Sequence, residues 1–178
     1  MRRIITSFAR SVLPLYITGF ILGILPSGIY AQDKVRLINQ EFEVRLFDNT
    51  IVRAGDIKDR IAVIDFWATW CKPCLAEVPD YNDFYRDYKD KGVVFLALAI
   101  DSGKEEKALK AAKRFNMEYP AGAPSKKEIK TIGKIRAFPT TWIIGPGGKI
   151  VREFVGDVSG KQETIREIVD QLLAGHAP

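Results

Sequence analysis

Two long apolar segments, Ile61–Trp67 and Val93–Ile100, dominate the hydrophobic pattern of the chain. Each is nearly continuous rather than alternating, which is typical of strands that are covered on both faces of a sheet. The exception is Asp65, a carboxylate in the middle of the first segment. The pattern therefore predicts two interior strands, one of which carries an acidic side chain into the core.

Alternating apolar and polar positions predict two hairpins, one before and one after these strands. Residues 35–52 alternate on either side of a turn at Asp48. Residues 138–144 and 149–155 flank the Gly/Pro-rich turn at 145–148, which predicts the second hairpin. Residues 56–60 are expected to form a polar connection.

Four segments have the apolar spacing of amphipathic helices. They cover about residues 71–89, 102–115, 125–132 and 159–173. Pro79 lies inside the first and is expected to kink it, and Gly92 follows its end. Capping pairs are expected at the starts of the other three helices. These pairs are Ser102 with Glu105, Ser125 with Glu128, and Ser159 with Gln162.

The order of elements is a hairpin, then strand–helix–strand–helix, a short helix, a hairpin and a final helix. Strands separated by helices run parallel, with the helices on the faces of the sheet. The predicted fold class is therefore α/β, a three-layer sandwich with a mixed central sheet and an extra N-terminal hairpin. We expect residues 32–178 to form this domain and residues 1–31 to be a separate segment.

Composition is that of a globular protein, with 47% hydrophobic and 28% charged residues in 178. The net charge is +5, but Arg2, Arg3 and Arg10 account for most of it. The domain itself is nearly balanced, so the charge gives no reason to expect binding to nucleic acid.

Residues 1–31 have the features of an export segment. A basic start, Met1-Arg2-Arg3, precedes an apolar run over about Val12–Leu25, and Ala31 suits cleavage by a signal peptidase. The alternative is an uncleaved membrane anchor, for which the apolar run is short unless it extends to Tyr30. Either interpretation places the domain outside the cytoplasm.

Cys71 and Cys74 are the only cysteines, and they stand between a predicted strand and a predicted helix. A structural zinc site needs further cysteine or histidine ligands, and His176 near the C-terminus is the only histidine. A disulfide across so short a loop would stabilise the fold little. The pair is therefore predicted to be a redox-active dithiol that requires no metal and no cofactor.

The segment from Phe66 to Cys74, with Pro79 and the later Phe138-Pro139-Thr140-Thr141, resembles the thioredoxin superfamily. The export segment, the leading hairpin and the Cys-x-x-Cys-x-x-Glu-x-Pro pattern are similar to its extracytoplasmic TlpA/ResA-like branch. The resemblance covers about residues 35–174. It implies a thioredoxin-like fold and a thiol–disulfide oxidoreductase activity.

The position of the cysteines and the resemblance together predict the roles of the site residues. Cys71, at the helix start, is expected to be the exposed, low-pKa nucleophile, and Cys74 the buried resolving thiol. Pro139 corresponds to the cis-proline of the superfamily, whose loop pairs with the substrate chain. The substrate-binding residues expected beside the cysteines are Trp70, Lys72, Pro73, Phe138 and Pro139. Lys72 has the alternative of a solvated lysine, and Phe138 that of ordinary packing.

Asp65 and Glu77 are the candidate proton acceptors for Cys74. Asp65 lies six residues before Cys71, like the buried aspartate of thioredoxin, and Glu77 lies three after Cys74, like the glutamate of the ResA-like branch. No lysine stands on the segment Val93–Ile100, so Asp65 is expected to lack a cation and to have a raised pKa. The alternatives are a structural buried acid at Asp65 and a solvated helix residue at Glu77.

The resulting hypothesis is a reductase that acts on disulfides of exported proteins, such as apocytochrome c, and is itself reduced by a membrane thiol donor. A copper chaperone on the same fold would need histidine or methionine ligands near the cysteines. A peroxidase would need a threonine where Ala68 stands. An oxidant of the folding-catalyst type is disfavoured by the Lys-Pro pair between the cysteines.

Overall fold

The computed structural model describes residues 35–175. The predicted export segment, residues 1–31, and the domain boundary that follows it lie outside the described residues, so both stay predictions. Within residues 35–175, no helix is both long enough and apolar enough to cross a membrane.

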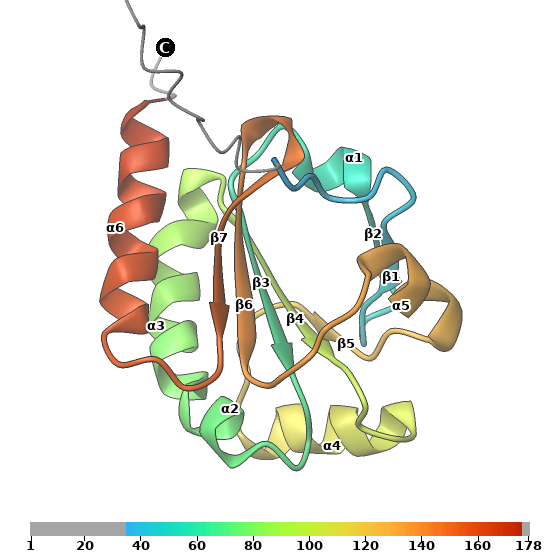
Figure 1. Cartoon of the computed structure of the whole chain (residues 1–178). Helices are drawn as coiled ribbons and strands as arrows, with labels where there is room; N and C mark the ends of the chain where they lie inside the picture. The colour runs from blue at the N-terminus through green and yellow to red at the C-terminus, as the bar shows by residue number, and fades with distance from the viewer. Residues whose placement is uncertain (1–34, 176–178) are drawn as a thin grey trace, which may run out of the picture. The chain divides into compact units, whose positions relative to one another are not determined.

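A five-stranded sheet forms the centre of the domain (Figure 1). Its strand order is β5-β4-β3-β6-β7. The first three strands in this order are parallel, whereas β6 and β7 run antiparallel to their neighbours. The strands are β3 (Ala62–Trp67), β4 (Val94–Ala99), β5 (Ala121–Gly122), β6 (Thr140–Gly145) and β7 (Lys149–Val155). The predicted mixed sheet with two interior strands is confirmed.

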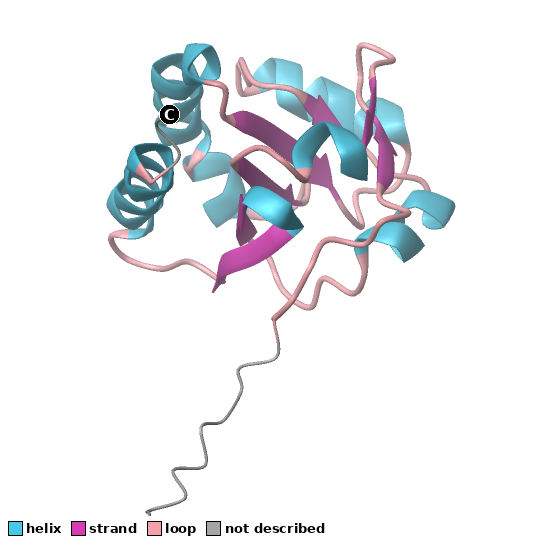
Figure 2. Ribbon diagram, turned by 90° about the horizontal axis from the view of Figure 1, so that it is seen from above, coloured by secondary structure: helices cyan, strands magenta, loops and turns pink. Residues whose placement is uncertain are grey.

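Two layers cover the sheet (Figures 1 and 2). Buried side chains of one face pack with α3 (Val78–Tyr88), α4 (Glu105–Arg114) and α6 (Lys161–Ala174). The other face packs with the hairpin β1 (Glu43–Arg45) and β2 (Ile51–Arg53), and with α1 (Ala54–Ile57) and α5 (Lys126–Ile132). The predicted leading hairpin is present but shorter than expected, because only residues 43–53 form it and Leu37 instead makes an antiparallel bridge with Lys149 of β7. The helix α1, residues 54–57, overlaps the start of the expected connection at 56–60.

Successive side chains of β3 point to opposite faces of the sheet, and this alternation determines the face to which Asp65 points. Val63 and Trp67 belong to the α3/α6 face, whereas Ile64 and Phe66 belong to the hairpin face. Asp65 therefore points to the α3/α6 face. The two cysteines pack into that same core, so the acidic residue and the sulfurs share one layer.

The helix boundaries correct part of the sequence interpretation. Pro79 does not kink one helix; it lies in the first turn of α3, after a separate short helix, α2 (Lys72–Ala76). The capping box of Ser125 and Glu128 is confirmed. The other two expected caps are wrong, because α4 begins after Lys104 and α6 after Gly160, each without a side-chain cap.

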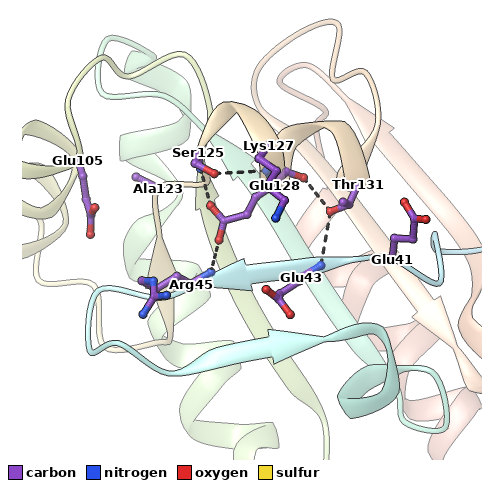
Figure 3. Close-up of a pocket in the computed structure, with 9 residues that line it drawn as sticks. All are labelled: Glu41, Glu43, Arg45, Glu105, Ala123, Ser125, Lys127, Glu128 and Thr131. Atoms are coloured by element: carbon purple, nitrogen blue, oxygen red, sulfur yellow. Dashed lines mark hydrogen bonds between the residues drawn. The ribbon is translucent and has the colours of Figure 1, made fainter.

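Side chains of α5 accept hydrogen bonds from backbone N–H groups of β1 and so hold the N-terminal hairpin against this helix (Figure 3). Glu128 Oε1 accepts a hydrogen bond from the Arg45 N–H at 2.8 Å, and Thr131 Oγ1 accepts one from the Glu43 N–H at 3.4 Å. These contacts line a pocket of about 590 Å³. None of the predicted site residues lines it.

Candidate active site

Cys71 and Cys74 form a disulfide where β3 passes into α2. Cys71 is the N-cap residue of α2 and has an extended backbone, and its Sγ accepts a hydrogen bond from the Cys74 N–H at 3.3 Å. Pro73 fits the first turn of a helix because it has no N–H to leave unbonded there. In the reduced protein the same N–H would stabilise a thiolate at Cys71.

The two cysteines are almost equally buried in this oxidised state. Cys71 is 4% exposed and Cys74 is 2% exposed, so the expectation of an exposed Cys71 is wrong for the disulfide form. The disulfide holds the sulfur of Cys71 against the first turn of α2, within the core shared with α3 and α6. Lys72 is exposed and Pro73 is half-buried beside it.

The register of the sheet brings the Pro139 loop to the cysteines. Because β6 is antiparallel to β3 and Phe66 pairs with Thr140, the residues before Thr140 lie at the end of β3 from which Cys71 follows. The Phe138–Pro139 peptide bond is cis, which confirms the prediction for this proline. The Pro139 carbonyl accepts a hydrogen bond from the Gly156 N–H at 2.7 Å, which fastens this loop to the end of β7.

Trp70 and the half-buried Phe138 form an aromatic pair next to the cysteine motif in the chain and the cis-Pro139 loop. Trp70 directly precedes Cys71 in the chain, and Trp70 is 57% exposed. Its Nε1–H donates to the carbonyl of Asp101 at 3.0 Å, and its ring meets that of Phe138 edge to face, with centroids 5.6 Å apart. Phe138 also packs against both cores, so the packing considered for it is present, and its contact with a substrate stays a prediction.

Asp65 is 2% exposed and is held by a hydroxyl from the neighbouring strand. Thr141 Oγ1 lies 3.2 Å from Asp65 Oδ1, and the Tyr81 hydroxyl of α3 lies 2.8 Å from Thr141 Oγ1. Burial is the main cause that raises the pKa of Asp65 to about 7, and Glu77 also raises it, whereas the charge of Lys161 and the hydrogen bonds lower it. The predicted rise in pKa is therefore confirmed.

The expectation that Asp65 lacks a nearby cation is wrong. As predicted, β4 carries no charged residue, but α6 supplies Lys161, which is 3% exposed. Its Nζ lies 2.5 Å from Glu77 Oε1. The Glu77 side chain is 13% exposed, so it is not the solvated helix residue considered as an alternative. Burial raises the pKa of Glu77, and the ion pair with Lys161 opposes the rise.

Sequence reasoning missed four residues of this site: Tyr81, Ser102, Thr141 and Lys161. The Ser102 hydroxyl accepts a hydrogen bond from the Thr69 N–H at 3.0 Å, so Ser102 holds the turn before Cys71 instead of capping α4. One feature of the sequence could have pointed to Lys161, namely its position at the start of a helix. A lysine at the first position of a helix is unfavourable beside the positive end of the helix dipole.

With this geometry in place, comparison with known proteins gives a consistent result. Residues 37–153 match the AhpC/TSA family. The chain belongs to this family. One relative, the thiol-disulfide oxidoreductase ResA of Bacillus cereus (strain ATCC 10987), is 31% identical over 86% of this chain and 90% of its own length. ResA of Oceanobacillus iheyensis is 29% identical over 80% of this chain and 77% of its own length.

Solved structures agree on the fold of this AhpC/TSA family member. A thiol:disulfide interchange protein of the thioredoxin family from Chlorobium tepidum superposes with a TM-score of 0.64. It is 23% identical, and the match covers 78% of this chain and 97% of the other. A thiol:disulfide interchange protein from a Bacteroides species has a TM-score of 0.63 and 25% identity, over 76% and 90% of the two chains.

The family and its ResA relatives identify the chain as a thiol–disulfide oxidoreductase, and the structure contains a Cys71–Cys74 disulfide. Residues 35–175 contain no group of three or more His, Cys, Asp or Glu side chains arranged to hold a metal ion.

Proposed function

We propose that this oxidoreductase reduces disulfides in exported proteins. The observation that carries the proposal is the redox pair at the start of α2, beside the cis-Pro139 loop and in one layer with the buried Asp65. The ResA relatives support a thiol–disulfide function of the same type. The export features of residues 1–31 support a location outside the cytoplasm, either after cleavage or at a membrane anchor.

The proposed reaction transfers two electrons from the dithiol to the substrate. The Cys71 thiolate attacks one sulfur of the substrate disulfide, and the other sulfur leaves as a thiolate. Cys74 then loses its proton and attacks Cys71 Sγ. The Cys71–Cys74 disulfide forms, and the second substrate sulfur leaves as a thiolate. A membrane thiol donor would then return two electrons to the pair.

Asp65 is proposed as the group that takes the proton of Cys74. A base of this kind works best when its pKa is near the working pH, and burial raises the pKa of Asp65 to about 7. Glu77 is less suited to this role because Oε1 is already paired with Lys161 at 2.5 Å. Asp65 points into the layer that contains both cysteines, which favours transfer within the core.

Trp70, Phe138 and the cis-Pro139 loop are proposed to contact the substrate. The exposed Trp70 ring and the half-buried Phe138 offer an apolar surface next to the sulfurs. An extended substrate chain would pair with the loop backbone as an added strand. Lys72, exposed at the first position of α2, would contact the same chain. Apocytochrome c, which carries a cysteine pair, is the proposed substrate class.

Trapping of mixed disulfides tests this function. In the native organism, the Cys74→Ser variant should retain substrates bound to Cys71, because it lacks the resolving thiol. The control is the double variant Cys71→Ser/Cys74→Ser, which should retain none. Capture of cytochrome c precursors would support the proposed substrate. Capture of a broad set of exported proteins would overturn that assignment and indicate a general folding role.

The direction of electron flow has its own measurement. The equilibrium between the dithiol and the disulfide is followed in glutathione buffers of known composition. A reductant should have a reduction potential at least as low as that of thioredoxin, about −270 mV. A potential near that of a strong oxidant, about −120 mV, would overturn the proposed direction.

A further inference from the structure

Lys161 is a buried lysine at a position that is unfavourable for a cation for two separate reasons. It is the first residue of α6 and is 3% exposed. A cation at a helix N-terminus opposes the helix dipole, and a buried ammonium loses its hydration. The preceding residue, Gly160, is in the left-handed region and provides no side-chain cap. Such a violation of local preferences is expected where a residue has a specific task.

The surroundings of Lys161 are strongly acidic. A pocket of about 290 Å³ at the start of α6 is lined by both partners of the ion pair. Its other acidic lining residues are Asp80 of α3, Asp157 of the β7–α6 loop and Glu163 of α6. Lys161 is the only basic residue among those that line it. The Nζ lies 2.5 Å from Glu77 Oε1 and 5.7 Å from the centre of the Tyr81 ring.

Asp65 and Glu77 influence each other through the same low-dielectric region. The charge of Glu77 raises the pKa of Asp65, whereas the charge of Lys161 lowers it. The other titratable side chains facing these groups are Tyr81 of α3 and Tyr119, which precedes β5. Both tyrosines are uncharged at neutral pH, because burial raises their pKa further. Lys161 is therefore the cation that balances the two carboxyl groups in this cluster.

We propose that Lys161 is a positioning residue for the disulfide chemistry, which holds Glu77 as a carboxylate so that Asp65 is the group that exchanges the Cys74 proton near neutral pH. This inference rests on the proposed function and extends it to a residue outside the thioredoxin motif. Without the ammonium, no cation would offset the repulsion between the two carboxylates, and each carboxyl group would hold its proton to a higher pH. A smaller fraction of Asp65 would then be ionised and able to accept the Cys74 proton at neutral pH.

The test measures the resolving step in the full chain with dithiodipyridine, a chromogenic disulfide probe. The reduced protein releases one thiopyridone when Cys71 attacks and a second when Cys74 resolves the mixed disulfide. The rate of the second release is measured against pH. In Lys161→Gln, the midpoint of this profile should rise by about one pH unit, with about a fivefold lower rate at pH 7. The plateau at high pH should be unchanged.

Two variants separate charge from packing. Lys161→Arg keeps the cation and should restore the midpoint of the wild type. Lys126→Gln, at an exposed lysine of α5, is the matched control and should leave the profile unchanged. An unchanged midpoint in Lys161→Gln would overturn the inference, as would an equal upward shift in Lys161→Arg.

In Lys161→Gln, Glu77 loses its ion-pair partner, and the variant could fail to fold for that reason. A third variant provides the test in that case. Lys161→Gln/Glu77→Gln removes both charges of the pair and should return the midpoint toward that of the wild type, because the two effects on Asp65 have opposite signs. A midpoint that stays raised would contradict the charge balance. The probe is not a biological substrate, so a failure to trap exported proteins would reject the proposed function without affecting these profiles.

Discussion

Thr141 donates its hydroxyl hydrogen to Asp65 Oδ1 across the β3–β6 ladder, at 3.2 Å. A hydroxyl has only one hydrogen, so the 2.8 Å contact between Thr141 and Tyr81 uses the hydrogen of Tyr81. When Asp65 gains a proton at Oδ1, the order can reverse: the carboxyl group then donates to Thr141, and Thr141 donates to Tyr81. The chain of hydroxyls therefore accommodates both protonation states of Asp65 in a dry core.

The raised pKa of Asp65 makes the stability of the oxidised protein depend on pH. Its pKa rises from 3.8 to about 7 on folding, so the folded state binds more protons between these values. Stability from this group is complete below pH 3.8 and is lost as the pH rises through 7. The full difference corresponds to about 4 kcal/mol. Asp65→Asn, which mimics the protonated form, should therefore be more stable than the wild type at pH 8.

Urea denaturation of the disulfide form at several pH values measures this effect. The gain in the free energy of unfolding should be about 2–4 kcal/mol at pH 8 and should vanish below about pH 4. Asp59→Asn, at an exposed aspartate, is the control and should show no such dependence. A gain for Asp65→Asn that is equal at all pH values would mean that the folded-state pKa of Asp65 is not raised.

Thr141→Val should raise the pKa of Asp65 above 7. The valine cannot donate to the carboxylate, and the loss of a hydrogen bond to the charged form favours the protonated form. The midpoint of the pH profile for resolution by Cys74 should shift upward. The free energy of unfolding should fall by about 1 kcal/mol, because the hydrogen bonds through the hydroxyl are lost. Thr141→Ser, which keeps the hydroxyl, should preserve the midpoint; a shift as large in Thr141→Ser would contradict this role.

The fold was largely predictable because its signals are local. The apolar segments of β3 and β4, the turn between β6 and β7 and the glycines after helices each act within a few residues. The wrong helix caps at Ser102 and Ser159 have a physical cause. A serine before a helical pattern satisfies the local rule, but its hydroxyl bonds wherever the folded chain offers a partner, and Ser102 finds the Thr69 N–H.

The site was predictable only in its motif-bearing part. The cysteines, the cis-Pro139 loop and Asp65 belong to motifs whose residue types and spacing can be recognised in the sequence. Lys161 does not, because its contact with Glu77 joins positions 84 residues apart, through the docking of α6 on α3. The expectation that Asp65 lacks a cation rested only on the adjacent strand, β4. In the fold, the ammonium group comes from α6, which belongs to the helical layer and not to the sheet.

Phe138→Ala should weaken reactions with protein disulfides more than reactions with small ones. The Phe138 ring meets the exposed Trp70 ring edge to face at 5.6 Å, and the two provide apolar area beside the sulfurs. A pair of this kind contributes about 0.5–1.5 kcal/mol, which corresponds to a two- to tenfold loss of rate with a folded protein substrate. The rate with oxidised glutathione should change less than twofold, within the scatter of a surface substitution.

The matched control for this prediction is Phe115→Ala, at an exposed phenylalanine directly after α4. Its removal should leave both rates unchanged. Equal losses with the protein substrate and with glutathione in Phe138→Ala would indicate that the ring acts on the disulfide itself. The contact role at the substrate surface would then be rejected.

Ser102→Ala should loosen the turn that leads into the disulfide. The buried Ser102 hydroxyl accepts from the Thr69 N–H at 3.0 Å and donates to the Ile100 carbonyl at 3.3 Å. Removal leaves the N–H of Thr69 without this acceptor, at a cost of about 1–3 kcal/mol in the free energy of unfolding. Hydrogen exchange at Thr69 should accelerate, and the attack rate of Cys71 should change with it, because this turn positions Cys71.

Ser125→Ala provides the comparison, since Ser125 makes the capping box that Ser102 does not. Its loss should lower the free energy of unfolding by about 1 kcal/mol, with no effect on the thiols. The contrast between the two serines is the decisive measurement. If both variants lose stability but neither changes the reactivity of Cys71, then Ser102 only fills space in the loop. A change confined to Ser102→Ala would show that its hydroxyl holds the turn in the geometry that the cysteine needs.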